Sequence, residues 1–405
     1  MRKLFLTILG ILAVQAVLAQ TDESQKYMRG SLCMMMVEHP TLEYNKDIEQ
    51  VFEKMDIPER FNSHDLGVRI IRFANDKDQQ ANITIFAKDN QLGKKFVSKW
   101  FGRNKKTGAF KIDLVKERGN YNATKADVEN ALRQHRGLSI LEDAGENLIG
   151  HTYWVVNDVK YVNQGNFFKG MKDATNLAMS GVQAASTKGK SLEKAFDNKA
   201  AEAFDFLDDI KGFRVKITSY LFRLKWNEDI QNIFYSNYYT DEPENEPDKV
   251  KGFVNDKDLF SLEYVGSVTN TSSKTSLSGV TSNEAMIRKV CTRAFDKNIA
   301  DLQHEFADFR IKALLVSTEP LKAYVGMKED ITESSRYEVL ETEIDERGVT
   351  KYKRIGVIKP IPGKIWDNRY MASEEGSSES KLDATYFEKV SGGEFYSGYL
   401  IREIK

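Results

Sequence analysis

Histidines come first among the residues that could do chemistry, because histidine is the commonest metal ligand and general base. The chain has His39, His64, His135, His151 and His304. No two of them stand at the spacing that paired ligands on one helix require. His304 and the glutamate after it begin like a zinc-protease signature, but Asp308 stands where the second histidine should be. His64 precedes Asp65, and adjacent side chains on a strand diverge. We therefore expect no catalytic histidine, and a zinc site assembled across the fold stays open.

Motifs for nucleophilic catalysis and phosphate binding also fail. No Gly-x-Ser-x-Gly sequence is present. The two cysteines, Cys33 and Cys291, lie in an apolar run and on an apolar helix face, so we expect two buried free thiols; a disulfide is the alternative. Gly189 to Ser191 suggests a phosphate loop, but Ala184 stands where its first glycine is needed. We expect no cofactor and no enzymatic activity.

Acidic residues carry little information in a chain with 60 of them. Glu142, Asp143 and Glu146 could belong to a glycosidase, whose two carboxyl groups must be set at a fixed separation by the fold. The simpler interpretation is that they solvate the outer face of a helix. Hydrolysis of a glycan or of the cell wall is therefore the alternative function that the sequence leaves open.

One short run has the composition of a recognition surface. Trp366, Asp367, Arg369 and Tyr370 stand close together, and tryptophan, arginine and tyrosine are the residue types that anchor interfaces. We take these four as the candidate binding residues. The alternative is structural: Trp366 fills the core of a barrel, Asp367 pairs with Arg369, and the asparagine between them turns the chain.

The stretch from residue 138 to residue 162 organises the elements that would position these groups. A short apolar helix over residues 140–148 ends at Gly150, and a strand that we expect to be buried on both faces begins at Thr152. Its partners precede it. We expect strands at residues 31–37, 68–73, 82–86 and 110–114, and helices at 45–55, 92–100 and 124–136. Met34, Met35 and Met36 alternate within the first strand, which favours a core role over a metal site.

The second half continues the sheet and then changes character. Residues 165–211 predict a helical insertion between two paired strands, of which the second spans 213–219 and bends near 220–226. We expect further strands at 233–235, 260–265 and 309–316, loops at 241–250 and 266–282, and a long helix at 283–306. Short strands with tight turns follow Pro320, at 322–325, 336–342, 350–359, 364–368, 385–390 and 396–403, and predict a small barrel.

The N-terminus predicts export. Arg2 and Lys3 precede an apolar run that is shorter than the roughly 20 residues of a membrane span, and Ala19 ends a suitable cleavage site. We expect a signal peptide at residues 1–19, a periplasmic or secreted mature chain that could associate with the outer membrane, and no membrane span after cleavage.

Charge excludes other functions. The 59 basic and 60 acidic residues nearly cancel, which argues against nucleic acid. The one basic cluster predicts a solvated helix face and loop, with an anionic surface or glycan as the alternative contact; it comprises Lys94, Lys95, Lys99, Arg103, Lys105 and Lys106.

Together these patterns predict an α+β protein, with a mixed or antiparallel sheet and packed helices followed by a small C-terminal SH3-like β-barrel. We divide the chain into a signal peptide (1–19), an N-terminal α/β region (20–130), a central α/β domain with the 165–211 insertion (131–319) and the barrel (320–405).

Several of these pieces resemble envelope proteins of gram-negative bacteria. The helix and strand over residues 140–162, the strand from Phe213 and the helix over 283–306 resemble the α/β domain of TolB N-terminal-like and curli-secretion lipoproteins. The runs at 323–330, 336–340 and 354–358 resemble the SH3-like barrel that ends flagellar assembly protein T. The insertion and the absence of a lipid-anchor cysteine depart from the first family, and no functional residue carries over. The likeness implies a protein that binds other envelope proteins through its surfaces.

The functional expectation follows from this organisation. An exported, modular chain without a catalytic motif is expected to act as a non-enzymatic protein-binding adaptor or assembly factor of the cell envelope. Other envelope proteins are its expected partners, and a homo-oligomer stays open.

Overall fold

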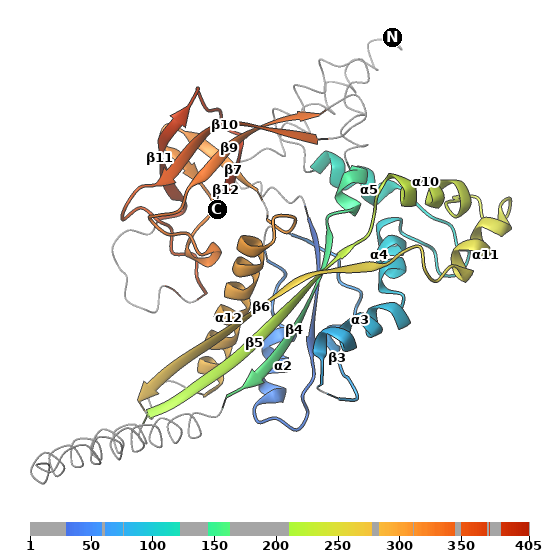
Figure 1. The fold of residues 1–405 in the computed structure, drawn as a ribbon, viewed down its shortest axis with the longest axis horizontal. Coiled ribbons are helices and arrows are strands. Elements are labelled where there is room, and N and C mark those ends of the chain that lie inside the picture. The colour runs from blue at the N-terminus through green and yellow to red at the C-terminus, as the bar shows by residue number, and fades with distance from the viewer. Residues whose placement is uncertain are drawn as a thin grey trace, which may run out of the picture.

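A mixed β-sheet forms the centre of the molecule (Figure 1). The structure is a computed structural model that describes residues 30–58, 61–75, 77–121, 145–162, 210–277, 283–310, 312–344, 350–370, 372 and 382–404. Strand β4 (Thr152–Tyr161) pairs in parallel with β1 (Ser31–Val37) and antiparallel with β5 (Ile210–Leu224). Strand β6 (Leu262–Leu277) extends the sheet beyond β5, and two short strands, β2 (Asn62–Ser63) and β3 (Ile70–Ile71), pair in parallel with β1.

Helices cover both faces of this sheet (Figure 1). On one face lie α2 (Asn45–Glu53) and the long α12 (Asn283–Glu305). The other face carries α3 (Gln79–Asp89), α4 (Leu92–Trp100), α5 (Asp113–Tyr121), α10 (Glu228–Asn237) and α11 (Pro247–Asn255). Because β4 lies between two hydrophobic cores, its first eight residues are buried, as the sequence predicts.

Residues of β1 alternate between the two cores. Cys33 and Met35 pack into the core under α3 and α4, and Met34 and Met36 pack into the core under α12. The prediction that the methionines are core residues is confirmed. Cys33 and Cys291 are buried free thiols as expected, and they lie in opposite cores, separated by the sheet.

The C-terminal part forms a closed six-stranded β-barrel, which confirms the predicted fold class. Its strands follow the order β10-β11-β8-β7-β12-β9 around the barrel. Strand β7 lies before Pro320, so the first barrel strand precedes the boundary that the sequence suggests. The strands are β7 (Ala313–Thr318), β8 (Leu321–Ala323), β9 (Tyr337–Ile344), β10 (Thr350–Pro360), β11 (Thr385–Gly392) and β12 (Leu400–Glu403). The predicted strand at 364–368 is wrong, since only one bridge, from Trp366 to Gly326, forms there.

Three other predicted strands are wrong: two lie within helices, and the third lies in an irregular segment that leads into a helix. The run at 82–86 lies in α3, where the Asp78 side chain accepts a hydrogen bond from the amide of Ala81 at 3.0 Å and caps the helix. Only Ile83 of this run is fully buried, and Ile85 is 57% exposed. Packing of one helical face thus overrides the strand preference of β-branched residues. The run at 110–114 enters α5, and the run at 233–235 lies in α10, which Asn227 caps.

Strand β6 is longer than expected. The predicted loop at 266–282 continues the strand to Leu277, and every residue from Gly266 onward pairs with β5. The sequence did not predict this part of the strand because its serine and threonine residues give no apolar alternation. The hydroxyl groups of Thr218 in β5 and Thr269 in β6 hydrogen-bond across the two strands at 2.9 Å. The bend expected near residue 220 is confirmed as a register shift between Leu221 and Phe222. The loop at 241–250 is partly wrong, since α11 begins at Pro247.

The basic cluster is only partly solvated. Lys94 is 9% exposed and donates to the backbone carbonyls of Val254 and Asp256, and Lys99 donates to that of Asp65. These two lysines tie loops to α4, so the prediction of a solvated face is wrong for them. Lys95, Lys105 and Lys106 are exposed as expected.

The signal peptide, the helix at 124–136 and the insertion, apart from its last two residues in β5, lie outside the described residues. Within the described ranges, every helix is too short or too polar to cross a membrane.

Candidate functional site: a groove between helix α12 and the barrel

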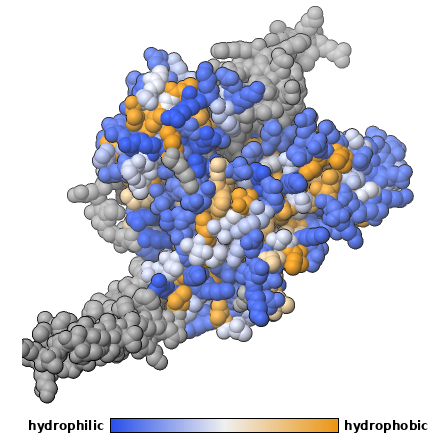
Figure 2. All heavy atoms as spheres, in the orientation of Figure 1, coloured by the Kyte–Doolittle hydropathy of each residue, from blue (hydrophilic) through white to orange (hydrophobic). Residues whose placement is uncertain are grey.

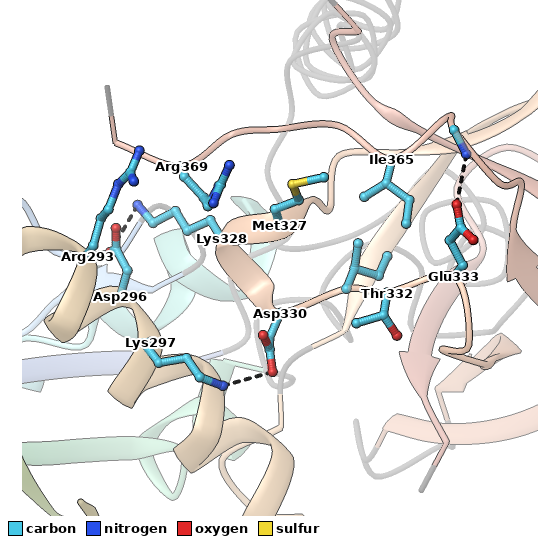
Figure 3. A pocket seen from close by; sticks show the side chains of 12 residues that line it. Arg293, Asp296, Lys297, Met327, Lys328, Asp330, Thr332, Glu333, Ile365 and Arg369 are labelled. Carbon is cyan, nitrogen blue, oxygen red and sulfur yellow. Dashed lines mark hydrogen bonds and ion pairs between the residues drawn. The ribbon is translucent and has the colours of Figure 1, made fainter. Parts of the chain in front are cut away.

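Helix α12 supplies one wall of the site. Its apolar stripe, which includes Cys291 and Phe295, faces the sheet and is buried. A different face of the helix carries three charged residues. Asp296 and Lys297 follow Arg293 by three and four residues, so the three side chains lie on that same face. That face looks toward the barrel (Figure 3).

A tight turn at the start of the barrel supplies the other wall. It holds the 3-10 helix η1 (Met327–Glu329), which the Glu329 carboxylate caps by accepting from the amide of Gly326 at 2.7 Å. The amide of Met327 donates to the carbonyl of Trp366 at 2.9 Å. A Cβ atom on Gly326 would lie 2.4 Å from that carbonyl oxygen, so the close approach of the two segments requires glycine here.

The two walls enclose an open groove of about 660 Å³. Figure 3 shows ionic groups crossing between them. The ammonium of Lys328 lies 3.4 Å from the Asp296 carboxylate, and Lys297 lies 2.9 Å from Asp330. Met327 lines the groove and is 39% exposed. Its side chain gives the groove an apolar contact point beside the paired charges. The remaining lining is mixed: Ile331, Thr332, Glu333, Gly363, Ile365 and Arg369.

The electrostatics reflect partial burial. Burial raises the pKa of Asp296, and the neighbouring Lys328 opposes this by favouring the carboxylate. Burial also tends to lower the pKa of Lys297, but its hydrogen bonds to Asp301 and Asp330 outweigh this effect and raise it. Within the described residues, the groove carboxylates of Asp296 and Asp330 therefore each have a lysine partner, which holds the two walls together.

The sequence-predicted binding residues lie beside this groove, and only Arg369 lines it. Asp367 accepts from the guanidinium of Arg369 at 2.8 and 2.7 Å, and this pairing lowers the pKa of Asp367. The Tyr370 carbonyl accepts from Arg293 at 3.1 and 3.0 Å. Trp366 is half-buried and supports the turn through its backbone. The pairing of Asp367 with Arg369 is thus a structural contact, and a binding role for the four residues remains a prediction.

Most of the groove was not found from the sequence. Arg293, Asp296 and Lys297 sit at helical spacing opposite the apolar stripe, a signal that equally fits a solvated face. Lys328 and Asp330 follow Met327 in a short charged run with no motif. Long-range contacts build the groove: the bridge from Gly326 to Trp366 joins two segments of the barrel wall. The ion pairs of Lys328 with Asp296 and of Lys297 with Asp330 join that wall to α12. Among the described side chains, no three metal-binding groups gather in a ligand arrangement.

The surface around the groove carries no broad hydrophobic face. Figure 2 shows mainly hydrophilic residues on the described part of the visible face, with small hydrophobic patches between them. In comparisons with known proteins, no family model matches the chain, and no curated protein matches it.

Proposed function

We propose that the protein is an exported, non-enzymatic adaptor of the cell envelope, and that the groove between α12 and the barrel is where it docks a partner protein. One observation carries this: Met327 is exposed in the lining of a groove whose neighbouring charges are held in place by ion pairs. Interfaces favour methionine and arginine, and pre-organised side chains lose little entropy on binding. Export is supported by the basic and apolar N-terminal residues 1–19.

Binding fits the groove better than hydrolysis. A glycosidase needs one carboxyl group that donates a proton and another that stays ionised at a set separation. In the groove, Asp296 and Asp330 each pair with a lysine, and Glu333 accepts from the amide of Gly363 at 3.1 Å. These three carboxylates therefore form structural contacts in the groove walls. We therefore propose docking as the function of this site.

Site-specific photo-crosslinking in the native envelope tests the docking surface. A photoreactive phenylalanine analogue replaces Met327 in one variant and Val254 in a control variant, because Val254 is 55% exposed on α11, outside the groove. We expect one discrete adduct with an envelope protein from position 327 and none from position 254. An identical adduct pattern from both positions would refute docking in the groove. Cell fractionation and the N-terminal sequence of the mature chain, expected to begin at Gln20, test export.

A further inference from the structure

The barrel and the α/β part of the chain are anchored in separate hydrophobic cores. Phe309 packs into the core between α12 and the sheet, where its ring lies 5.1 Å from Phe61 and 4.9 Å from Tyr153, measured between centroids. Ala313 already belongs to the core of the barrel. The chain therefore passes from one core to the other through the short connection between Phe309 and Ala313. A few residues between two packed units can act as a hinge, because they absorb the change in backbone angles.

Polar contacts hold the barrel against α12. The two ion pairs of the docking groove cross this interface. A third pair joins the last turn of the helix to β12, where the Nδ1–H of His304 donates to the Glu403 carboxylate at 2.8 Å. Close packing is incomplete between these contacts, since Ala300 of α12 and Val325 and Ile401 of the barrel line a cavity of about 40 Å³. Units that meet through a polar interface commonly move relative to each other.

His304 is the group in this interface whose charge changes near neutral pH. Its Nε2 lies 4.0 Å from the Asp330 carboxylate, which also pairs with Lys297. The hydrogen bond to Glu403 and the nearby acidic groups raise the pKa of His304, although partial burial opposes them. Titratable or charged groups face this part of the interface from every neighbouring element: Asp301 of α12, Arg310 after it, Glu329 and Asp330 of the turn at η1, Tyr337 of β9 and Glu403 of β12.

The sign of the pH effect follows from the raised pKa of His304. The pairing of protonated His304 with Glu403 favours the closed interface fully below the ordinary histidine pKa of about 6.5. It is lost as pH rises through the raised pKa of the closed form. The contacts that remain are weaker: Lys297 and Asp330 are 44% and 46% exposed, so water can replace their pairing. The barrel is thus held less tightly at alkaline pH.

We propose that the barrel is a hinged domain, and that protonated His304 is the latch that closes it on α12. Loss of the proton to solvent weakens the bond to Glu403 and lets the barrel rotate about the connection between Phe309 and Ala313. This rotation separates the two walls of the docking groove. A further consequence, that a docked partner is held less tightly at alkaline pH, rests on the proposed function, whereas the rotation itself does not.

The reactivity of a thiol inside the interface measures this opening even where the open form is rare. Ala300→Cys places one sulfur atom beside the cavity, at a position that is 3% exposed. Its rate of reaction with N-ethylmaleimide is divided, at each pH, by the rate of Val254→Cys, an exposed thiol on α11. We expect this ratio to rise roughly two- to tenfold from about pH 5.5 to about pH 8.5. Glu403→Gln, added to Ala300→Cys, should raise the ratio at the lower pH and make it nearly independent of pH.

Two further thiols separate opening of the barrel from unfolding. Val325→Cys, 4% exposed on the opposite wall of the cavity, should show the same rise in a chain with an unaltered α12. The native Cys291 lies in the core between α12 and the sheet, so it reacts only when that core opens. Peptide mass mapping follows each thiol, and we expect positions 300 and 325 to react faster than Cys291.

Two results would overturn the latch. One is a ratio for both interface thiols that does not change with pH. The other is reaction of these thiols at the rate of Cys291, because exposure would then come from unfolding. Neither result depends on a partner protein, so a missing crosslink at position 327 would refute docking in the groove and leave the latch standing.

Discussion

Removing the cation beside Asp296 should destabilise the protein in a way that depends on pH. The Lys328 ammonium lies 3.4 Å from the carboxylate, and the two side chains are 30% and 14% exposed. At that distance and an effective dielectric constant of about 20, Coulomb's law gives on the order of 5 kcal/mol of attraction. Desolvation of both groups and screening of the more exposed lysine offset most of it. We therefore expect Lys328→Met to lower the free energy of unfolding by about 1–3 kcal/mol at neutral pH.

The sign of the pH dependence follows from the pKa of Asp296, which burial raises above its ordinary value. Without Lys328 the pKa should rise further, so the folded state holds its proton to a higher pH than the unfolded state does. The loss in free energy of unfolding caused by Lys328→Met is then fully present above the pKa of Asp296 in the folded variant. It disappears as pH falls toward the ordinary aspartate pKa of about 3.9.

Urea unfolding of the wild type, Lys328→Met, Asp296→Asn and the double variant, at several pH values, measures this effect. The double variant should recover most of the loss, because it leaves no buried charge without a partner. Lys353→Met is the control, since Lys353 lies 3.8 Å from Glu341 and is 65% exposed. Its removal should change stability by less than about 0.5 kcal/mol. A loss in Lys328→Met that is independent of pH and equal in the double variant would refute the reasoning.

Three further predictions follow from other contacts. The Nδ1–H of His304 donates to the Glu403 carboxylate at 2.8 Å, and this hydrogen bond, with Asp330 and Asp301 nearby, raises the pKa of His304. The pairing of protonated His304 with Glu403 stabilises the fold fully below the ordinary histidine pKa of about 6.5, and this stabilisation is lost as pH rises through the raised pKa of the folded state. Glu403→Gln should therefore lower Tm at pH 6 and flatten the pH dependence of Tm. Gly326→Ala should cost on the order of 1–3 kcal/mol because its Cβ would lie 2.4 Å from the Asn368 Oδ1 atom, whereas Gly393→Ala, with open space around it, should be nearly neutral in the same thermal melt. Burial raises the pKa of Cys33 and Cys291 to about 12, so Ellman's reagent should find no thiol in the folded protein and two in denaturant; two reactive thiols before unfolding would contradict this burial.

Strong local signals made some elements predictable from the sequence. Leu92, Phe96 and Trp100 recur every four residues, and they form the buried face of α4. A continuous apolar run identified β4 as a strand buried on both faces. An error arose where tertiary packing outweighed local preference: the run at 82–86 packs Ile83 into the core as part of α3, whose first turn Asp78 caps. In the second half of β6, pairing with β5 forms a strand from a run of mostly serine and threonine residues.

The candidate groove was less predictable because its walls meet only in the folded chain. Arg369 was found through residue type alone, whereas Asp296 and Lys328 come from segments whose sequences resemble any solvated surface. Their contact depends on how the barrel closes and on the turn at Gly326. No periodicity within either segment encodes that closure.

The most direct test of the docking proposal is the affinity of the partner recovered by crosslinking at position 327. Its dissociation constant is measured by titration against the wild type and against Met327→Asp, with Val254→Asp as the control. A charge placed at a buried contact of a docked interface should cost about 2 kcal/mol or more, which is a roughly thirtyfold loss of affinity. We expect that loss in Met327→Asp and an unchanged affinity in the control. Equal affinity for the wild type and Met327→Asp would contradict docking in the groove between α12 and the barrel.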